Sequence, residues 1–244
     1  MLSGKGGVGK STVACHLAFY LAAKGFQVGL LDLDICGPSI PKITGTEGNF
    51  THSHLGGISP VLVCDNLYAM SVGYLIESQD SALIWRGPKK NGLIKQFLRD
   101  VDWGELDFLV IDTPPGTSDE HLTLKTYVKD IKGAIVVTTP QDVATLDVKK
   151  QINFCRKASI PVLGLVENMK SFICPCCGNE EEIFMSFNGG GNKLSSDYDV
   201  DYLGSIILDP QIAFSCDQGN IPESHGMNSL VFDKILQAVQ NKDE

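Results

Sequence analysis

The first twelve residues, MLSGKGGVGKST, restrict the fold of this chain more than any other part of its sequence. Gly4 and Gly9, followed by Lys10 and Ser11, fit the pattern G-x-x-x-x-G-K-[ST] of a phosphate-binding loop. Its glycines allow successive backbone N–H groups to point at one anion, and a following helix directs its positive end there. A glycine-rich turn without a ligand is the alternative, but apolar residues recur at helical spacing directly afterwards. The sequence therefore predicts a strand, a phosphate-binding loop and a helix, in that order.

The side chains of this loop have different expected roles. Lys10 is expected to reach the outer phosphates of ATP, and the Ser11 hydroxyl is expected to bind Mg²⁺. Thr12 places a second hydroxyl close by. The predicted nucleotide-binding residues of the loop are Gly4, Lys5, Gly6, Gly7, Val8, Gly9, Lys10, Ser11 and Thr12.

Lys5, directly after the first glycine, narrows the class of loop. An extra lysine at this position marks the deviant P-loop group, which resembles nitrogenase iron protein and the division-positioning and partition ATPases. In that group the lysine of one subunit reaches the nucleotide of its partner across a dimer. The resemblance implies that Lys10 acts at the phosphates of its own chain and Lys5 at those of a partner.

Composition bounds the class of protein. The chain has 244 residues, of which 43% are hydrophobic, so it can bury a sizeable core within one α/β domain. Its formal net charge is −9 and its pI is about 5.0, which disfavours a nucleic-acid partner. No apolar run has the length of a membrane span, and we expect no membrane partner. Eight cysteines without an export signal indicate free thiols in a reducing, cytoplasmic setting.

Apolar runs alternate with helical patterns along the chain, which predicts a mostly parallel sheet with helices on both faces. A single P-loop NTPase domain over residues 1–244 is the simplest interpretation. A hairpin inserted into the alternation of strands and helices is expected over 58–72, turning at Asp65 and Asn66, and an amphipathic helix over 228–241. Strands are predicted at 28–33, 106–111, 134–138, 161–166 and 202–208, and helices at 10–23, 92–98, 120–128, 143–157 and 190–196.

The start of the chain departs from the usual pattern. A phosphate-binding loop normally follows a full strand, and here only Met1 and Leu2 precede it. We therefore expect the first strand to be truncated, and the natural protein to begin earlier. A shortened gene is the alternative.

Acidic residues end two of the predicted strands. Asp112 follows the strand at 106–111, and Asp32 and Asp34 end the strand at 28–33. Because a carboxylate at the end of an apolar strand needs a partner, Mg²⁺ bound to a nucleotide is the natural one. We expect Asp112 to hold the Mg²⁺ shell and Asp34 to contact that shell or orient the attacking water. Asp32 is interpreted as structural, and Gly116 is expected to bring its N–H to the γ-phosphate. An ordinary turn or helix cap is the alternative for each aspartate.

Two residues are candidates for contact with the base. Asn168 follows the strand at 161–166, and its carboxamide can pair a donor and an acceptor with adenine. The segment Leu208-Asp209-Pro210, which closes the last predicted strand, is expected to pack over the base, with Pro210 as its candidate contact. Simple turn residues after strands are an equally good interpretation of both.

The segment FICPCCGN carries the second informative motif. Cys174 and Cys177 form C-x-x-C with Pro175 inside and Gly178 after it, which is the shape of a metal-binding knuckle over 172–179. A zinc half-site, a redox pair and an iron–sulfur half-site all fit the residues. Spacing alone favours zinc, but no second C-x-x-C completes a zinc ribbon. Two ligands per chain suit a cluster shared across a twofold axis. Cys176 is expected to point away, and the isolated cysteines to be core or loop residues.

Taken together, these motifs resemble the Mrp/Nbp-type P-loop NTPases, which are scaffolds for iron–sulfur clusters. The matching segments span nearly the whole chain, and the most specific are WRGPKKN and DTPPGTSDEH; LDLDICGPSIPK and the cysteine motif also match. Two short segments, FLRDVDWGE and NFCRK, favour the Nbp-type subunit over its Cfd-type partner. The chain departs from the Nbp-type pattern because it lacks an N-terminal four-cysteine extension, and Cys176 replaces the usual non-cysteine residue.

The resemblance implies a function and a set of partners. Cys174 and Cys177 of two subunits would hold a transient [4Fe–4S] cluster, and ATP would gate its loading or its transfer to cytosolic and nuclear apoproteins. The expected assembly is a homodimer or a heterotetramer with a homologous scaffold subunit, which meets recipient apoproteins and targeting factors. The alternatives are a spatial-organiser ATPase, which the acidic chain disfavours, and an ATP-driven reductase, whose cysteines come from two separate loops.

Overall fold

The computed structural model describes residues 1–54, 57–75, 87–220 and 226–242, without the side chains of 87, 88 and 226–228. The first three residues of the matching segment IWRGPKKN, 84–86, lie outside the described residues.

Eight strands form two four-stranded sheets at the centre of the molecule. One contains β1 (Leu2–Ser3), β8 (Ala134–Thr138), β9 (Val162–Glu167) and β12 (Tyr202–Ser205), in that order and all parallel. The other contains β5 (Val61–Cys64), β6 (Leu67–Met70), β2 (Val28–Asp32) and β7 (Phe108–Asp112), in that order. Within this second sheet, β5 and β6 are antiparallel, whereas β2 is parallel to both β6 and β7. The predicted mostly parallel sheet is therefore confirmed.

Two hydrogen bonds of Met1, the residue before β1, connect the two sheets. The amino group of Met1 donates to the carbonyl oxygen of Ile111 at 2.6 Å, and the Thr113 hydroxyl donates to the carbonyl of Met1 at 2.8 Å. Next to this contact, Met1 and Leu2 together with residues of β7 and β8 line an apolar cavity of about 320 Å³. The expectation of a longer first strand stays a prediction.

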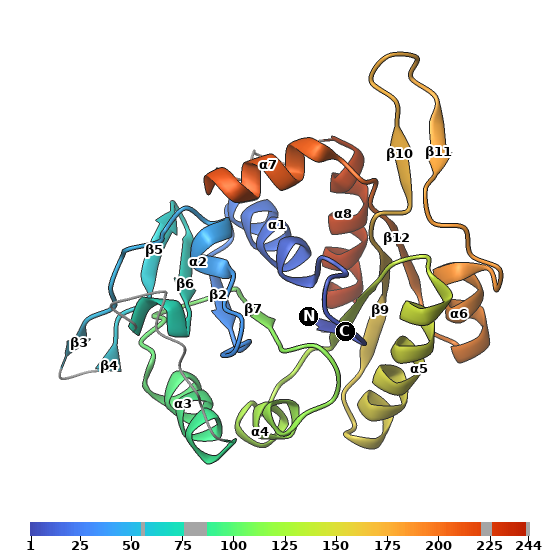
Figure 1. The fold of residues 1–244 in the computed structure, drawn as a ribbon. Coiled ribbons are helices and arrows are strands. Elements are labelled where there is room, and N and C mark those ends of the chain that lie inside the picture. The colour runs from blue at the N-terminus through green and yellow to red at the C-terminus, as the bar shows by residue number, and fades with distance from the viewer. Residues whose placement is uncertain (55–56, 76–86, 221–225, 243–244) are drawn as a thin grey trace.

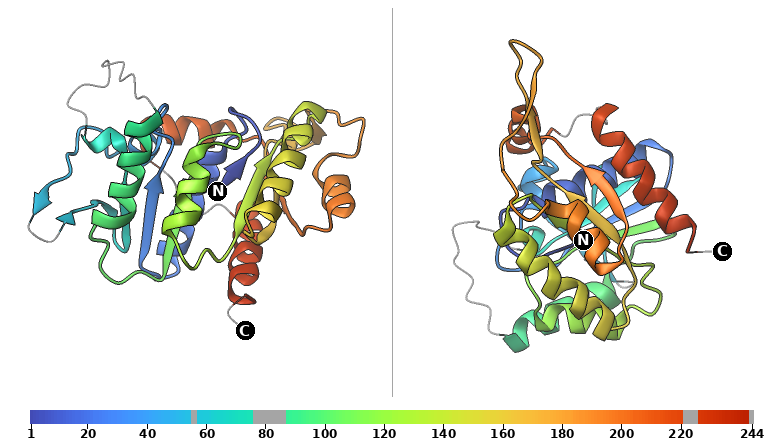
Figure 2. Two further views of the ribbon diagram at one scale, coloured as in Figure 1. Left: turned by 90° about the horizontal axis from the view of Figure 1, so that it is seen from below. Right: turned by 90° about the vertical axis from the view of Figure 1, so that its right-hand side faces the viewer.

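Helices cover both faces of the sheets, as predicted (Figures 1 and 2). The first helix and the last lie on one face, and the third, fourth and fifth on the other. The helices are α1 (Lys10–Ala23), α2 (Ile40–Ile43), α3 (Gly87–Asp100), α4 (Asp119–Tyr127), α5 (Asp142–Lys157), α6 (Gly190–Tyr198), α7 (Pro210–Gln218) and α8 (Gly226–Gln240), with a short 3₁₀ turn η1 (Val72–Leu75).

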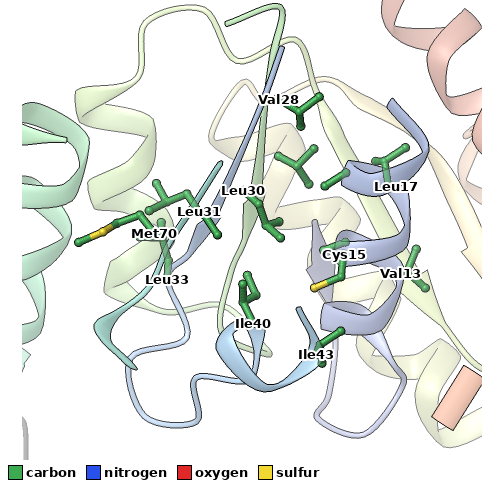
Figure 3. Close-up of a cluster of buried hydrophobic side chains, with 14 of the residues drawn as sticks. Val13, Cys15, Leu17, Val28, Leu30, Leu31, Leu33, Ile40, Ile43 and Met70 are labelled. Carbon is green, nitrogen blue, oxygen red and sulfur yellow. The ribbon is translucent and has the colours of Figure 1, made fainter. Parts of the chain in front are cut away.

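The core forms where α1 meets β2. Figure 3 shows Val13 and Leu17 of α1 on one side of the strand, with Leu31 and Met70 on the other. All four side chains are at most 3% exposed. Because β2 is buried on both faces, its sequence is apolar at every position up to Asp32 apart from one glycine, as expected for a central parallel strand. This packing holds the start of α1, which follows the phosphate-binding loop, in a fixed position relative to Asp32 and Asp34 at the end of β2.

Two small hairpins complete the fold. One joins β3 (Ser53–His54) to β4 (Gly57–Ile58), and the other joins β10 (Ser171–Ile173) to β11 (Glu180–Glu182). The second hairpin projects from the body of the molecule and carries the cysteine motif at its tip (Figures 1 and 2).

Several elements differ from those predicted. The hairpin at Asp65 and Asn66 forms as expected, and Asn66 adopts the left-handed φ of 65° that its turn requires. However, β6 also pairs with β2, so this hairpin is part of the central sheet and not an insertion. The described α3 begins at Gly87, five residues before the predicted start at 92. The sequence reading missed α7, although Asp209 caps it by accepting from the Gln211 N–H at 2.8 Å.

Candidate functional site

The predicted phosphate-binding loop lies between β1 and α1, and it has the conformation its glycines allow. Gly7 and Gly9 have φ angles of 80° and 81°, in the left-handed region that L side chains disfavour. A Cβ at Gly9 would lie 2.2 Å from Asn168 Nδ2, so a larger residue would displace that side chain. The loop therefore ends at the amino terminus of α1, and Asn168, the residue after β9, packs against its backbone.

The structure brings Lys10, Ser11 and Asp112 together. Lys10 Nζ lies 2.5 Å from Asp112 Oδ1, and the Ser11 hydroxyl donates to Asp112 Oδ2 at 2.5 Å. Asp112 is fully buried and Lys10 is 6% exposed. A buried carboxylate is stable only with such partners. The Ser11 hydroxyl and the Asp112 carboxylate are oxygen donors of the kind that Mg²⁺ prefers, so this donor set fits the predicted ion.

Asp32 organises the loop that carries Asp34. The Asp32 carboxylate accepts from the Asp34 N–H and from the Ser71 hydroxyl, each at 3.0 Å. Burial, with the charge of Asp112 adding to it, raises the pKa of Asp32 to about 7. Burial also raises the pKa of Asp34, against the opposing effect of the Lys10 charge. The structure thus gives Asp32 internal partners, while half-buried Asp34 lies close enough to Lys10 for their charges to interact.

Gly116 lies beside the phosphate-binding loop, but its N–H already has a partner. It donates to the carbonyl of Ser3 at 2.9 Å, and the glycine has a φ of 79°. The predicted approach of this N–H to a γ-phosphate therefore requires the bond to Ser3 to break. That bond joins two segments that are distant in the sequence, so no local pattern indicates it.

A cavity of about 390 Å³ adjoins the loop and is suited to a base and sugar. Asn168 lines this cavity, and its Nδ2 also donates to the carbonyl of Val8 at 2.9 Å. Pro210 is exposed at the start of α7 and does not line the cavity. Leu208 and Asp209, from the segment expected to pack over the base, do line it. The lining also includes residues for which the sequence analysis predicted no role: His16, Met169 and Ile212.

The cysteine motif forms a tight turn at the tip of the β10–β11 hairpin. The Cys174 N–H donates to the Asn179 carbonyl at 2.9 Å, and the Gly178 N–H donates to the Cys174 carbonyl at 2.8 Å. Backbone N–H groups of Cys177 and then Cys176 are directed at the Cys174 sulfur and lower the pKa of that thiol. Such N–H groups favour a thiolate, which is the form that binds metal. One part of the predicted knuckle is therefore present, namely the N–H groups at the Cys174 sulfur, and the metal half-site stays a prediction.

The cysteine turn is incomplete as a metal centre within one chain. Cys176 and Cys177 are exposed and Cys174 is half-buried, so exposure alone does not separate the expected ligand Cys177 from Cys176. In the described part of the chain, no group of three or more His, Cys, Asp or Glu side chains is arranged to hold a metal ion.

Comparison with known proteins identifies the family. A family model described as a NUBPL iron-transfer P-loop NTPase, of the ParA group, matches residues 1–241. The chain belongs to this family. A nucleotide-binding protein from Archaeoglobus fulgidus, solved with ADP and containing cobalt, is 37% identical, with 90% of this chain and 85% of that chain covered and a TM-score of 0.77.

More distant solved structures share the fold of this NTPase. The septum site-determining protein MinD from Pyrococcus horikoshii, solved with Mg-ADP, is 23% identical over 100% of this chain and 94% of that chain, with a TM-score of 0.65. MinD from Aquifex aeolicus is 17% identical over 100% and 95%, also with a TM-score of 0.65. These similarities confirm the predicted P-loop NTPase architecture.

Lys5 of this NTPase contacts a residue at the start of α5. Its Nζ donates to Gln141 Oε1 at 3.4 Å, just before α5. The lysine that marks the deviant loop is therefore hydrogen-bonded within its own chain, next to the first turn of α5.

The helices in the described part of the chain are all too short or too polar to span a lipid bilayer.

His121 is a buried polar residue of the NTPase to which the sequence reading gave no role. Its Nδ1 is 3.2 Å from the Ser118 N–H, and its Nε2 is 3.1 Å from the Thr113 hydroxyl. It thereby links the start of α4 to the residue after Asp112. Burial lowers the pKa of His121 to about 4. The structure shows a capping box between Ser118 and His121, but the usual sequence pattern has Glu or Gln at the position of His121. Ser118 as a preferred N-cap residue was therefore the available sequence signal.

Proposed function

We propose that this NTPase is an ATP-dependent scaffold that assembles a [4Fe–4S] cluster between two subunits and passes it to cytosolic and nuclear apoproteins. The observation that carries the proposal is the cysteine turn, whose Cys174 sulfur receives N–H groups at the exposed tip of a hairpin. The match to an iron-transfer NTPase family over residues 1–241 supports iron as the cargo.

The number of thiols supports a shared cluster. A [4Fe–4S] cluster takes four thiolates, and Cys174 and Cys177 supply two from each chain. Two copies related by a twofold axis supply the complete set. The same hairpins brought together in a heterotetramer with a homologous subunit supply an equivalent set. Because the eight cysteines are free thiols, we place the protein in the cytoplasm, where thiols stay reduced.

In this proposal the nucleotide is a substrate that rearranges existing contacts. Lys10 exchanges Asp112 for phosphate oxygens, and the Gly116 N–H leaves the carbonyl of Ser3. Ser11 and Asp112 hold Mg²⁺, which supplies charge neutralisation at the phosphates when it is bound. Asp34 orients water, Asn168 contacts the base, and Lys5 reaches the partner's nucleotide. Hydrolysis then changes the contacts of both loops.

A short segment offers a route from these loops to the hairpin. Asn168 holds the carbonyl of Val8 in the phosphate-binding loop at 2.9 Å. Only two residues separate it from Ser171, where β10 begins. Met169 between them has a φ of 57°, so this stretch is tightly turned. A shift of the phosphate-binding loop is thereby transmitted to the base of the cysteine hairpin, which links nucleotide state to the cluster position.

Anaerobic reconstitution with sulfide and equal amounts of ferrous and ferric iron tests the proposal. We expect about two irons per chain, which is four per dimer, and the visible absorption of a [4Fe–4S] cluster. Cys174→Ala and Cys177→Ala should each lose this absorption and keep nucleotide affinity, whereas Cys176→Ala should retain both. Tight zinc that iron cannot displace would instead identify a structural zinc clasp. A cluster that persists in the double variant Cys174→Ala/Cys177→Ala would refute the ligand assignment.

A further inference from the structure

The chain that leaves the cysteine hairpin exposes apolar side chains in an alternating pattern. After β11, Ile183 is 44% exposed, Met185 78% and Phe187 93%, whereas Phe184 and Ser186 between them are half-buried. The three exposed side chains lie within five residues of one another, in a segment of bends and turns that directly follows β11. We call Ile183, Met185 and Phe187 the apolar strip.

The apolar strip continues onto the start of α5. The Ser186 hydroxyl and the Asn188 N–H both donate to Asp142 Oδ1, at 3.3 and 3.4 Å. On the same helix, Val143 is 66% exposed and Leu146 is 57% exposed. Isolated exposed apolar residues are ordinary, but a group of large ones on neighbouring segments marks an interaction surface. Figure 1 shows the segment between β11 and α6 running beside the beginning of α5.

This surface lies next to both features that the proposed function assigns to a partner. The strip follows β11 directly, and β11 pairs with β10, which leads into Cys174. The residue before Asp142 is Gln141, which holds Lys5 at 3.4 Å. All of these segments follow the carboxyl ends of parallel strands β1, β8 and β9, so they share one edge of the sheet.

We propose that the apolar strip, with Val143 and Leu146, packs against a second copy of this chain. The inference rests on the proposed function, in which two cysteine turns meet around a twofold axis. A twofold contact brings the same patch of both subunits together, so it must be self-complementary. Apolar side chains satisfy that condition because they bury against their own kind.

Charge on the hairpin supports the strip as the attractive part of this contact. β11 consists of three consecutive exposed glutamates, Glu180 to Glu182, in a chain of net charge −9. Like charges brought together repel, so two hairpins alone would push each other apart. The uncharged surface directly beyond β11 offers the compensating attraction. A recipient apoprotein on the same surface is the competing occupant, and the experiment below separates the two.

The test measures dimer dissociation constants by sedimentation equilibrium, anaerobically, with a non-hydrolysable ATP analogue, Mg²⁺ and the reconstituted cluster. Phe187→Ser should weaken the dimer at least tenfold, because large aromatic residues dominate interface energetics. Met185→Ser should weaken it to a smaller extent. Leu62→Ser is the matched control, since Leu62 is 56% exposed on β5 at the other end of the sheets (Figure 1). It should change the constant less than about twofold. Thermal unfolding of each monomer checks that the fold is intact.

Iron counting on the same samples separates the two proposals. In one outcome, the wild type binds about two irons per chain, and neither Phe187→Ser nor Phe187→Ser/Met185→Ser weakens the dimer. This outcome overturns the apolar strip as a subunit contact and leaves the shared cluster standing. A dimeric wild type without iron, weakened by Phe187→Ser, supports the strip while the cluster proposal fails. A wild type that stays monomeric under all of these conditions overturns the inference.

Discussion

At the phosphate-binding loop Lys10 and Asp112 form a buried ion pair, whereas on the β10–β11 hairpin Cys174 is half-buried and Cys177 is exposed. Asp112 is fully buried between Lys10 and Ser11, which come from a segment about a hundred residues away. Cys174 instead takes its contacts from residues within its own turn, and Cys177 beside it is exposed. One region depends on the whole fold, and the other depends on a few neighbouring residues.

This difference teaches where each region is vulnerable. A buried charge pair loses its balance when either member is removed, because the remaining charge stays without a partner. A local turn tolerates distant changes because its geometry comes from short-range bonds. We therefore expect a substitution in one region to impair that region alone: nucleotide binding and stability at the loop, or cluster binding at the hairpin.

The largest expected effect is that of Lys10→Ala. Nucleotide affinity should fall by about a hundredfold or more, because a charged donor to the phosphates is lost. The free energy of unfolding should also fall by roughly 3 kcal/mol, since Asp112 keeps only Ser11 as partner. Cluster reconstitution on the hairpin should be unchanged. Calorimetric titration, urea unfolding and iron counting measure the three quantities.

Two companion variants sharpen that result. Lys10→Ala/Asp112→Asn should recover much of the lost stability without recovering affinity, because it removes the unpaired buried charge. Lys5→Ala should keep affinity and lose hydrolysis, as expected of a lysine that acts across a dimer on developing charge. Full activity in both single lysine variants would refute their roles, and loss of the cluster in Lys10→Ala would refute the separation.

The sequence predicted the parts of both regions that rest on local patterns. The glycine pattern located the loop, and the strands β2 and β7 were evident because they are apolar up to Asp32 and Asp112. The knuckle followed from Pro175 and Gly178 within a few residues. In each case the signal and the structure involve the same short segment.

Long-range contacts could not be predicted in the same way. The bond from Asn168 to Val8 joins residues 160 apart, and the bond from Lys5 to Gln141 joins residues 136 apart. Gly116 was expected at a phosphate and is bonded to Ser3. Periodicity reports which side of a segment is buried but not which distant segment covers it. The pairing of β6 with β2 was missed for the same reason.

A second prediction concerns acid sensitivity of the buried region. Burial lowers the pKa of His121 to about 4, below the ordinary value of 6.5 expected in the unfolded chain. The unfolded state therefore binds the proton first, and stability from this residue is lost as pH falls from about 6.5 through about 4. His121→Gln cannot titrate, so its destabilisation relative to wild type should shrink by about 2 kcal/mol between about pH 7.5 and about pH 4.5.

Urea unfolding of both proteins at the two pH values measures that difference, and other acidic groups cancel because both chains carry them. The exposed cysteine turn should be unaffected, which sharpens the contrast between the regions. A pH-independent difference between His121→Gln and wild type would show that His121 is not buried in its neutral form.

A third, smaller effect is expected for Asp34→Asn. The amide keeps the size of the side chain but removes a charge that interacts with Lys10. Turnover should fall about tenfold while nucleotide affinity changes little, because a group that orients water acts mainly in the transition state. Steady-state hydrolysis and equilibrium binding separate the two quantities, with Asp197→Asn on exposed α6 as control. Wild-type turnover would identify Asp34 as a turn residue.

The smallest expected effect concerns the contact that holds Lys5 on its own chain. The bond from Lys5 to Gln141 is long, at 3.4 Å, and only partly buried, so it contributes about 0.5 kcal/mol. If Lys5 must leave Gln141 to reach a partner, Gln141→Ala should raise nucleotide-dependent hydrolysis by about twofold. Gln141→Glu should lower it, because a carboxylate holds the ammonium more tightly. Steady-state hydrolysis measured at several protein concentrations tests this role of Lys5. Opposite changes in the hydrolysis rates of the two variants, largest at concentrations where dimers are scarce, would show that Lys5 connects the nucleotide site to the subunit contact. Equal rates would show that Lys5 acts only within the loop of its own chain.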